Sequence, residues 1–294
     1  MKPPAPSPSP TRFGVLAAGG ALVAAFAFLY VDVLRKLVSD WANDDNYSHG
    51  FLIVPIAAYL TWERRHKLQA AVREPSVLGL VVIVGSLATL IAGVLGAELF
   101  LTRISLVGMT AGTVLFVLGW SHLRVLAFPI ACLLLMIPIP AIVFNQIAFP
   151  LQLLASQFGE AALNAFSVPV LREGNVMILA NTTLEVAEAC SGIRSLVSLL
   201  TLGILYGYFT DSRAMVRIGI ALSTIPIAIV TNGLRVAGTG IAAHYYGPEA
   251  AQGFFHEFSG WVVFVLAFAL VFLTMRLILL VAPPARPVEV VHVV

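Results

Sequence analysis

Residues 77–97 read VLGLVVIVGSLATLIAGVLGA, a run of 21 residues without a charged side chain. A helix of about 20 apolar residues is long enough to cross the roughly 30 Å hydrocarbon core of a bilayer. Similar runs recur along the chain and predict an all-α polytopic membrane protein with about eight transmembrane helices in one bundle. The expected spans are 13–33, 50–62, 77–97, 99–120, 123–144, 191–209, 215–245 and 258–281.

The composition of the whole chain agrees with a membrane protein. Hydrophobic residues make up 59% of the 294 residues and charged residues only 11%, whereas about 25% is usual in soluble domains. The net charge of +2 is small, and the apolar runs leave no basic face for a nucleic acid. We therefore expect the lipid bilayer as the main surroundings and no nucleic-acid partner.

The chain is expected to form one transmembrane domain, residues 13–282, between two short tails. Residues 1–12 are rich in proline and serine and predict a disordered tail, and residues 283–294 form the second tail. The first apolar run has no convincing small-residue cleavage site, so it is interpreted as an anchor and not as a cleaved signal peptide.

Basic residues set the expected orientation, because loops rich in lysine and arginine stay in the cytoplasm. The densest basic loop lies between the second and third spans and contains Arg64, Arg65, Lys67 and Arg73. Placing it in the cytoplasm puts both termini there as well. Arg35 and Lys36 then lie on the outer side, against the rule.

Three connecting segments then face outward, at about residues 39–50, 145–190 and 245–257. Within the second, residues 146–166 are amphipathic and are expected to lie in the membrane interface. Apolar and polar residues alternate on both sides of Ala180-Asn181-Thr182, which predicts a small hairpin before the sixth span.

Polar groups at the outer ends of three successive spans form the candidate site. Cys190 and Arg194 open the sixth span, Asn232 and Arg235 lie near the outer end of the seventh, and His256 opens the eighth. Polar groups in a membrane are costly and usually functional. Because consecutive helices of a bundle often pack side by side, these groups are expected to converge at the outer face.

The candidate site holds the groups needed for acyl transfer by cysteine. A helix N-terminus and a nearby arginine both favour the thiolate form of Cys190. A thiolate nucleophile, an imidazole that moves protons and a guanidinium that stabilises an oxyanion complete the chemistry. Cys132 lies within an apolar run and is interpreted as an inert packing residue.

Other interpretations of these residues stay open. Cys190 could fill space, Arg235 could extend to lipid headgroups and His256 could cap a helix. A zinc site built from Cys190, His244, His256 and Glu257 would lack a closely spaced ligand pair, so no metal or cofactor is expected. A transporter or scaffold for a small solute or lipid-linked sugar would place its polar groups at the bilayer midplane.

Four motifs resemble those of the exosortase/archaeosortase family. They are Ala189-Cys190-Ser191-Gly192-Ile193-Arg194, Asn232-Gly233-Leu234-Arg235, His256-Glu257-Phe258-Ser259-Gly260 and Asn46-Tyr47-Ser48-His49-Gly50-Phe51. The similarity extends over about residues 41–280, and the order of cysteine, arginine and histidine adds to its specificity.

The resemblance implies a membrane-embedded cysteine transpeptidase or protease. It assigns Cys190 as the nucleophile, Arg235 as the group that stabilises the oxyanion or orients the substrate, and His256 as the acid and base. The supporting residues that it implies are Arg194, Asn232, Tyr47 and His49.

The resemblance also implies the substrates and the location. The expected substrates are membrane-anchored proteins with a C-terminal sorting signal, made of a Pro-Glu-Pro-type motif, a membrane helix and a basic tail. The expected location is the bacterial inner membrane, with the active site on the periplasmic side. The acceptor nucleophile stays open.

Overall fold

The computed structural model describes residues 12–180, 182–186, 193–247 and 253–283. The chain divides into two compact units, Met1–Pro138 and Ile139–Val294, and each is described by itself. Cys190 belongs to residues 187–192, outside the described part. The expected single bundle over residues 13–282 stays a prediction.

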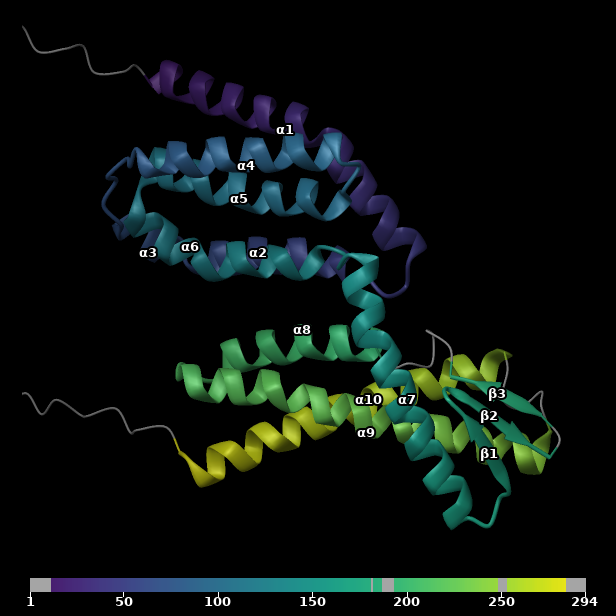
Figure 1. Ribbon diagram of the computed structural model, residues 1–294. Helices are drawn as coiled ribbons and strands as arrows, with labels where there is room; N and C mark the ends of the chain where they lie inside the picture. The colour runs from purple at the N-terminus through teal and green to yellow at the C-terminus, as the bar shows by residue number, and fades with distance from the viewer. Residues whose placement is uncertain (1–11, 181, 187–192, 248–252, 284–294) are drawn as a thin grey trace, which may run out of the picture. The chain divides into compact units, whose positions relative to one another are not determined.

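The named elements in the described part of the first unit are helices (Figure 1). Its helices are α1 (Arg12–Asn43), α2 (Gly50–Glu63), α3 (Arg65–Ala70), α4 (Leu78–Leu95), α5 (Leu99–Leu118) and α6 (Trp120–Cys132), which continues as the 3₁₀ helix η1 (Leu133–Met136). The hairpin of α4 and α5 is closely packed because small residues line the contact. A Cβ atom on Gly93 would lie 2.8 Å from the backbone nitrogen of Thr102, and one on Gly79 would overlap the backbone of Phe116. Small residues let membrane helices approach to this distance.

The predicted fifth span, residues 123–144, is wrong as one continuous helix. The helix ends at Met136, and α7 (Ala141–Ala165) begins after four residues. Proline lacks an N–H group and forces the residue before it into an extended conformation. Ile137, which precedes Pro138, has φ −88° and ψ 120°, as this rule requires. The sequence expectation followed the apolar character and overlooked the two prolines at 138 and 140.

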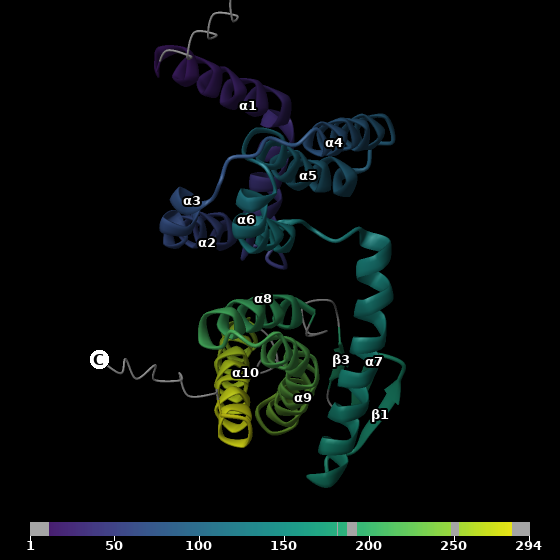
Figure 2. The ribbon, with the colours of Figure 1, turned by 90° about the vertical axis from the view of Figure 1, so that its left-hand side faces the viewer.

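The second unit combines four helices with a small sheet (Figure 2). After α7 come β1 (Val170–Glu173), β2 (Val176–Leu179) and β3 (Thr183–Glu185), and then α8 (Ile193–Thr210), α9 (Ala214–Tyr246) and α10 (Gly253–Val281). The strands are antiparallel in the order β1-β2-β3. The predicted hairpin is confirmed as β2–β3, where Ile178 pairs with Thr183, and β1 extends it to three strands.

Glycines allow α7 and α9 to pack closely. Cβ atoms on Gly233 and Gly159 would lie 2.7 Å and 2.8 Å from the side chains of Phe158 and Val236, respectively. The sheet covers this pair through a core cluster composed of Ala155, Leu163, Val168, Met177, Leu179, Val186 and Val236. Gly233 of the Asn-Gly-Leu-Arg motif is therefore a packing residue.

Five helices of the described part are long and apolar enough to cross a membrane. They are α4, α5, α7, α9 and α10, the last over Phe258–Val281. Shorter apolar helices occupy Gly50–Glu63 and Trp120–Met136. The polytopic character is thus confirmed, whereas the count of eight spans stays a prediction. The interfacial position of residues 146–166, which lie mostly within α7, also stays a prediction.

Candidate active site

The segment that contains Cys190 follows a residue that is firmly held, Val186. Val186, four residues earlier, is 2% exposed and belongs to the core beneath the sheet. Its N–H donates to the carbonyl of Asn175 at 2.9 Å, and Nδ2 of Asn175 donates back to the carbonyl of Val186 at 3.3 Å. The same Nδ2 lies 3.5 Å from Oε1 of Gln152 on α7. This double contact holds the chain against the sheet and α7 just before the candidate nucleophile.

The chain leaves this segment into α8, which is fixed by a second core. Leu199 of α8 is fully buried with Ile220 of α9 and Val271 of α10. Arg194, in the first turn of α8, is half-buried. The described chain thus stops at Val186 and resumes at the start of α8, a helix that packs against α9 and α10.

Arg235 reaches from α9 to α10. Its Nε donates to Oγ of Ser259 at 3.4 Å. A Cβ atom on Gly260 would lie 3.2 Å from the Nη2 atom of Arg235, so glycine at this position leaves room for the guanidinium. Arg235 is half-buried. Ser259 accepts this hydrogen bond as a neutral hydroxyl group.

His256 precedes Ser259 and Gly260 on α10 by three and four residues. Residues with this spacing share one face of a helix. His256 lies within α10, and its side chain is outside the described part. The structure thus brings Arg235 to the turn of α10 that follows His256, and it leaves untested the contact of either group with Cys190.

Asn232 lies one turn before Arg235 on α9. It is 3% exposed, which places it in the interior of the second unit. The sequence predicts Asn232 beside Arg235 at the candidate site. The structure confirms that the two share a helix and leaves a supporting role of Asn232 as a prediction.

Tyr47 and His49 belong to the first unit, where His49 helps to hold the end of η1. Tyr47 is 8% exposed. Nε2 of His49 donates to the carbonyl of Leu135 at 3.1 Å, and Nε1 of Trp41 donates to the carbonyl of Met136 at 2.9 Å. These carbonyls lack helical partners because the helix stops before Pro138. Burial lowers the pKa of His49, and its hydrogen bonds to backbone carbonyls partly oppose that effect. The resemblance groups both residues with the candidate site, and that role stays a prediction.

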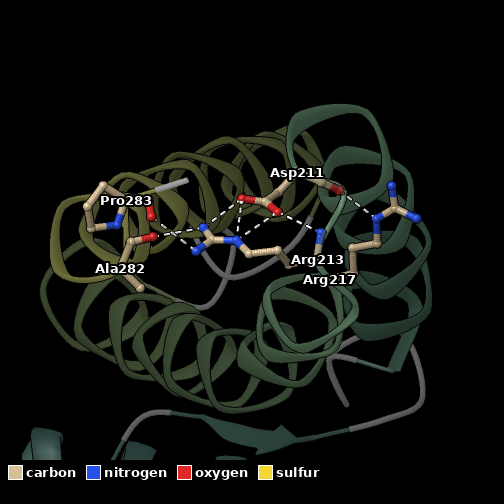
Figure 3. A network of polar contacts seen from close by, with 5 residues as sticks. All are labelled: Asp211, Arg213, Arg217, Ala282 and Pro283. Carbon is tan, nitrogen blue, oxygen red and sulfur yellow. Dashed lines mark hydrogen bonds and ion pairs between the residues drawn. The ribbon is translucent and has the colours of Figure 1, made fainter. Parts of the chain in front are cut away.

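A polar clasp that was not predicted from the sequence joins α8, α9 and α10 at the ends opposite the candidate site (Figure 3). Arg213 pairs with Asp211 at 2.7 Å and donates to the carbonyls of Ala282 at 2.8 Å and Pro283 at 3.4 Å. The hydrogen bonds from Arg213 lower the pKa of Asp211. The same contact raises the pKa of Arg213.

Arg217 adds a second link to this clasp. Its Nε donates to the backbone carbonyl of Asp211 at 2.6 Å, and its guanidinium lies 4.4 Å from the ring centroid of Tyr208. Arg213 and Arg235 are separated by 22 residues of α9, or about 33 Å along the helix. The clasp thus fixes the register of the three helices far from their candidate catalytic ends.

Asn175 and Gln152 were also not predicted from the sequence. Asn175 follows Gly174, which has a φ of +65°, and a Gly-Asn pair between two apolar segments is a turn signal. That signal identifies the turn, but it contains nothing about the contact with Val186. The zinc alternative depends on Cys190, His256 and Glu257, whose side chains lie outside the described part, so it stays untested.

Comparison with known families supports the motif resemblance. A family model described as transmembrane exosortase (Exosortase_EpsH) matches residues 41–273, most of the chain. Comparisons with curated proteins and with solved structures gave no match. The matched range includes all four motifs and the helices that position them. The chain therefore belongs to the transmembrane exosortase family.

Proposed function

We propose that this protein is a membrane cysteine transpeptidase or protease that cleaves C-terminal sorting signals through a Cys190 thioester. Membership of the exosortase family supports a transpeptidase or protease role in general. The observation that supports the site best is the contact of Arg235 with Ser259 and Gly260, one turn after His256. Arg235 thus contacts the turn of α10 that follows the proposed acid and base.

The proposed reaction begins when the membrane helix of the substrate docks beside α8, α9 and α10. Two molecules held in one membrane share depth and orientation, which raises their effective concentration. The Cys190 thiolate attacks the carbonyl carbon of the scissile peptide bond and forms a tetrahedral oxyanion. Arg235 stabilises the negative charge on that oxygen.

The intermediate then breaks down with the help of His256. The imidazolium donates its proton to the leaving amine, the C–N bond breaks, and a thioester remains on Cys190. An acceptor amine or water attacks the thioester, His256 takes the proton from that nucleophile, and the thiolate is released. Transfer to an amine gives transpeptidation, and transfer to water gives hydrolysis.

The proposed substrates are exported proteins with a Pro-Glu-Pro-type motif, a membrane helix and a basic tail. The positive-inside rule supports an orientation with both termini in the cytoplasm and the site at the outer face of the inner membrane. A basic substrate tail would then also stay on the cytoplasmic side, which is consistent with cleavage at the opposite face.

The proposal is tested by coexpression with a reporter that carries such a signal. Cys190→Ala and His256→Ala are expected to leave the reporter uncleaved, while the enzyme keeps its thermal unfolding midpoint. Cys132→Ala is the matched control, because it removes the other cysteine, which is buried in α6, and is expected to keep cleavage. Mass spectrometry of the wild-type protein is expected to detect an acyl group on Cys190.

Two results would overturn the proposal. Normal cleavage by Cys190→Ala would exclude a cysteine nucleophile. Acylation of another residue would move the site. The transporter alternative predicts a Cys190 thiol at the bilayer midplane, inaccessible to a membrane-impermeant thiol reagent added from outside.

A further inference from the structure

We infer that the first unit binds the headgroup of an anionic phospholipid in a cavity at one end of its apolar helices. The cavity measures about 470 Å³. Its walls include the apolar side chains of Leu68, Leu118 and Leu126. Its polar lining comes from Gln69, Arg73 and His122.

The cavity lies where four apolar helices begin or end. Its lining comes from the segment that links α2 to α4, from the last residue of α5 and from the start of α6. Trp62 ends the apolar part of α2 and is 59% exposed, and Trp120 opens α6 and is 48% exposed. Exposed tryptophans at helix ends are typical of the membrane–water interface. The cavity is therefore at the depth of lipid headgroups.

His122 provides the first specific indication of a ligand. The residue is 5% exposed, and its buried Nδ1 has no hydrogen-bond partner among the described residues. Buried polar atoms are nearly always hydrogen-bonded in native proteins. A protonated Nδ1 can donate to a phosphate oxygen, so a phosphate ligand would satisfy an atom that the protein leaves unsatisfied.

Arg73 provides the positive charge. Its side chain is exposed, and neither Arg73 nor Lys67 forms an ion pair within the described part of the chain. The backbone beside Arg73 is fixed on α5, since the N–H groups of Glu74 and Ser76 donate to the carbonyls of Leu118 and Leu115, each at 3.3 Å. A fixed backbone lowers the entropy cost of binding an anion at this position.

The other two arginines of this basic loop are already engaged in packing. Arg64 donates to the carbonyl of Val125 on α6, and the guanidinium of Arg65 lies 4.2 Å from the ring centroid of Trp62. Neither Arg64 nor Arg65 lines the cavity, so Arg73 is the cation of its described lining. Apolar walls and interfacial depth favour a phospholipid over a soluble phosphate, because the walls can cover the glycerol and the first acyl carbons.

Native mass spectrometry of the full chain in detergent tests this inference with two probes, phosphatidylglycerol and phosphatidylcholine. Phosphatidylglycerol is expected to bind about ten-fold more tightly than phosphatidylcholine. Arg73 complements the net negative charge of phosphatidylglycerol, whereas phosphatidylcholine has no net charge. Arg73→Gln is expected to remove this preference and His122→Gln to reduce it. Lys36→Gln is the matched control, since it removes an exposed cation of α1 that does not line the cavity.

Several outcomes would overturn the inference. An unchanged preference in Arg73→Gln would exclude the cavity, and because Arg73 is exposed, its replacement leaves the core intact. An equal loss in Lys36→Gln would indicate general surface charge. Displacement of the lipid by an equal concentration of glycerol 3-phosphate would show that the site binds soluble phosphate and not a lipid.

Discussion

Arg235 and Ser259 are hydrogen-bonded across α9 and α10 at 3.4 Å, directly beside a glycine. A Cβ atom on Gly260 would lie 3.2 Å from Nη2 and 3.3 Å from Cζ of Arg235. The guanidinium thus occupies space that only glycine leaves open. If Arg235 stabilises the oxyanion, its exact placement controls the rate.

Gly260→Ala is therefore expected to slow cleavage without unfolding the protein. A displacement of the guanidinium by a few tenths of an ångström weakens its contact with the oxyanion, and we expect a loss of about ten-fold in kcat with little change in KM. Reporter cleavage measures the rate. Gly238→Ala is the matched control, because a Cβ atom there meets nothing within 4 Å. An equal loss in both variants would exclude this account.

Asn175→Ala tests the anchor that precedes Cys190. The substitution removes the hydrogen bond from Nδ2 to the carbonyl of Val186. If Cys190 is the nucleophile, we expect cleavage to slow by about ten-fold, because the chain that leads to it is held less firmly at Val186. Asn164→Ala is the control, since this residue is exposed and its carbonyl, which receives the N–H of Ser167, is unaffected. Full activity of Asn175→Ala would show that α8 alone positions Cys190.

Apolar runs predicted most helices of this protein because the cost of exposing backbone in lipid leaves few alternatives. The same rule failed at Pro138 and Pro140, where the backbone geometry of proline ends the helix although the neighbouring residues are apolar. The β2–β3 hairpin was predicted from its alternation, whereas β1 contains two charged residues, Arg172 and Glu173, and gave no such signal. Local hydrophobic patterns thus identify the helices and strands whose own residues determine their conformation.

The candidate site was only partly predictable for a related reason. Motif resemblance selected Arg235 and His256, and helical spacing explains why Ser259 and Gly260 belong with them. The partner of Arg213 at the end of α10 lies about 70 residues further along the chain, and no local pattern encodes such a contact. Long-range polar contacts depend on the packing of whole helices and appear only in the structure.

Gly50→Ala is expected to destabilise the first unit. A Cβ atom on Gly50 would overlap the indole of Trp41, whose Nε1 donates to the carbonyl of Met136. Overpacking of this kind costs about 1–3 kcal/mol. Thermal unfolding in detergent measures the loss. Gly85→Ala is the control, because its added methyl group meets nothing within 4 Å, and its midpoint is expected to stay equal or rise slightly.

The first unit is also expected to lose stability in mild acid through His49. Burial lowers the pKa of His49 in the folded state below its ordinary value of about 6.5. Below pH of about 6.5 the unfolded chain therefore binds a proton that the folded chain does not, so stability is complete above that pH and falls as the pH is lowered toward the folded pKa. Unfolding midpoints between pH 7.5 and about 5.5 measure this slope. His49→Gln keeps a donor for the carbonyl of Leu135 and cannot titrate. Its unfolding midpoint is therefore expected to fall less steeply as the pH is lowered. An identical dependence on pH in this variant would exclude His49 as the cause of the acid sensitivity.

Arg213→Lys tests the clasp at the far ends of the three helices. Lysine keeps the charge but lacks the planar fork that contacts Asp211 and the carbonyl of Ala282 together. We expect a lower thermal midpoint, whereas Arg276→Lys, whose guanidinium lies 4.8 Å from the ring centroid of Phe272, is expected to change it less.

The ion pair between Arg213 and Asp211 also has a pH signature. Because Arg213 lowers the pKa of Asp211 in the folded state, the contribution of this pair is complete above the ordinary aspartate pKa of about 3.9 and is lost as the pH falls through the lower folded value. Asp211→Asn removes that acid-sensitive part, and an unchanged acid unfolding curve in this variant would show that the clasp does not hold the helices together.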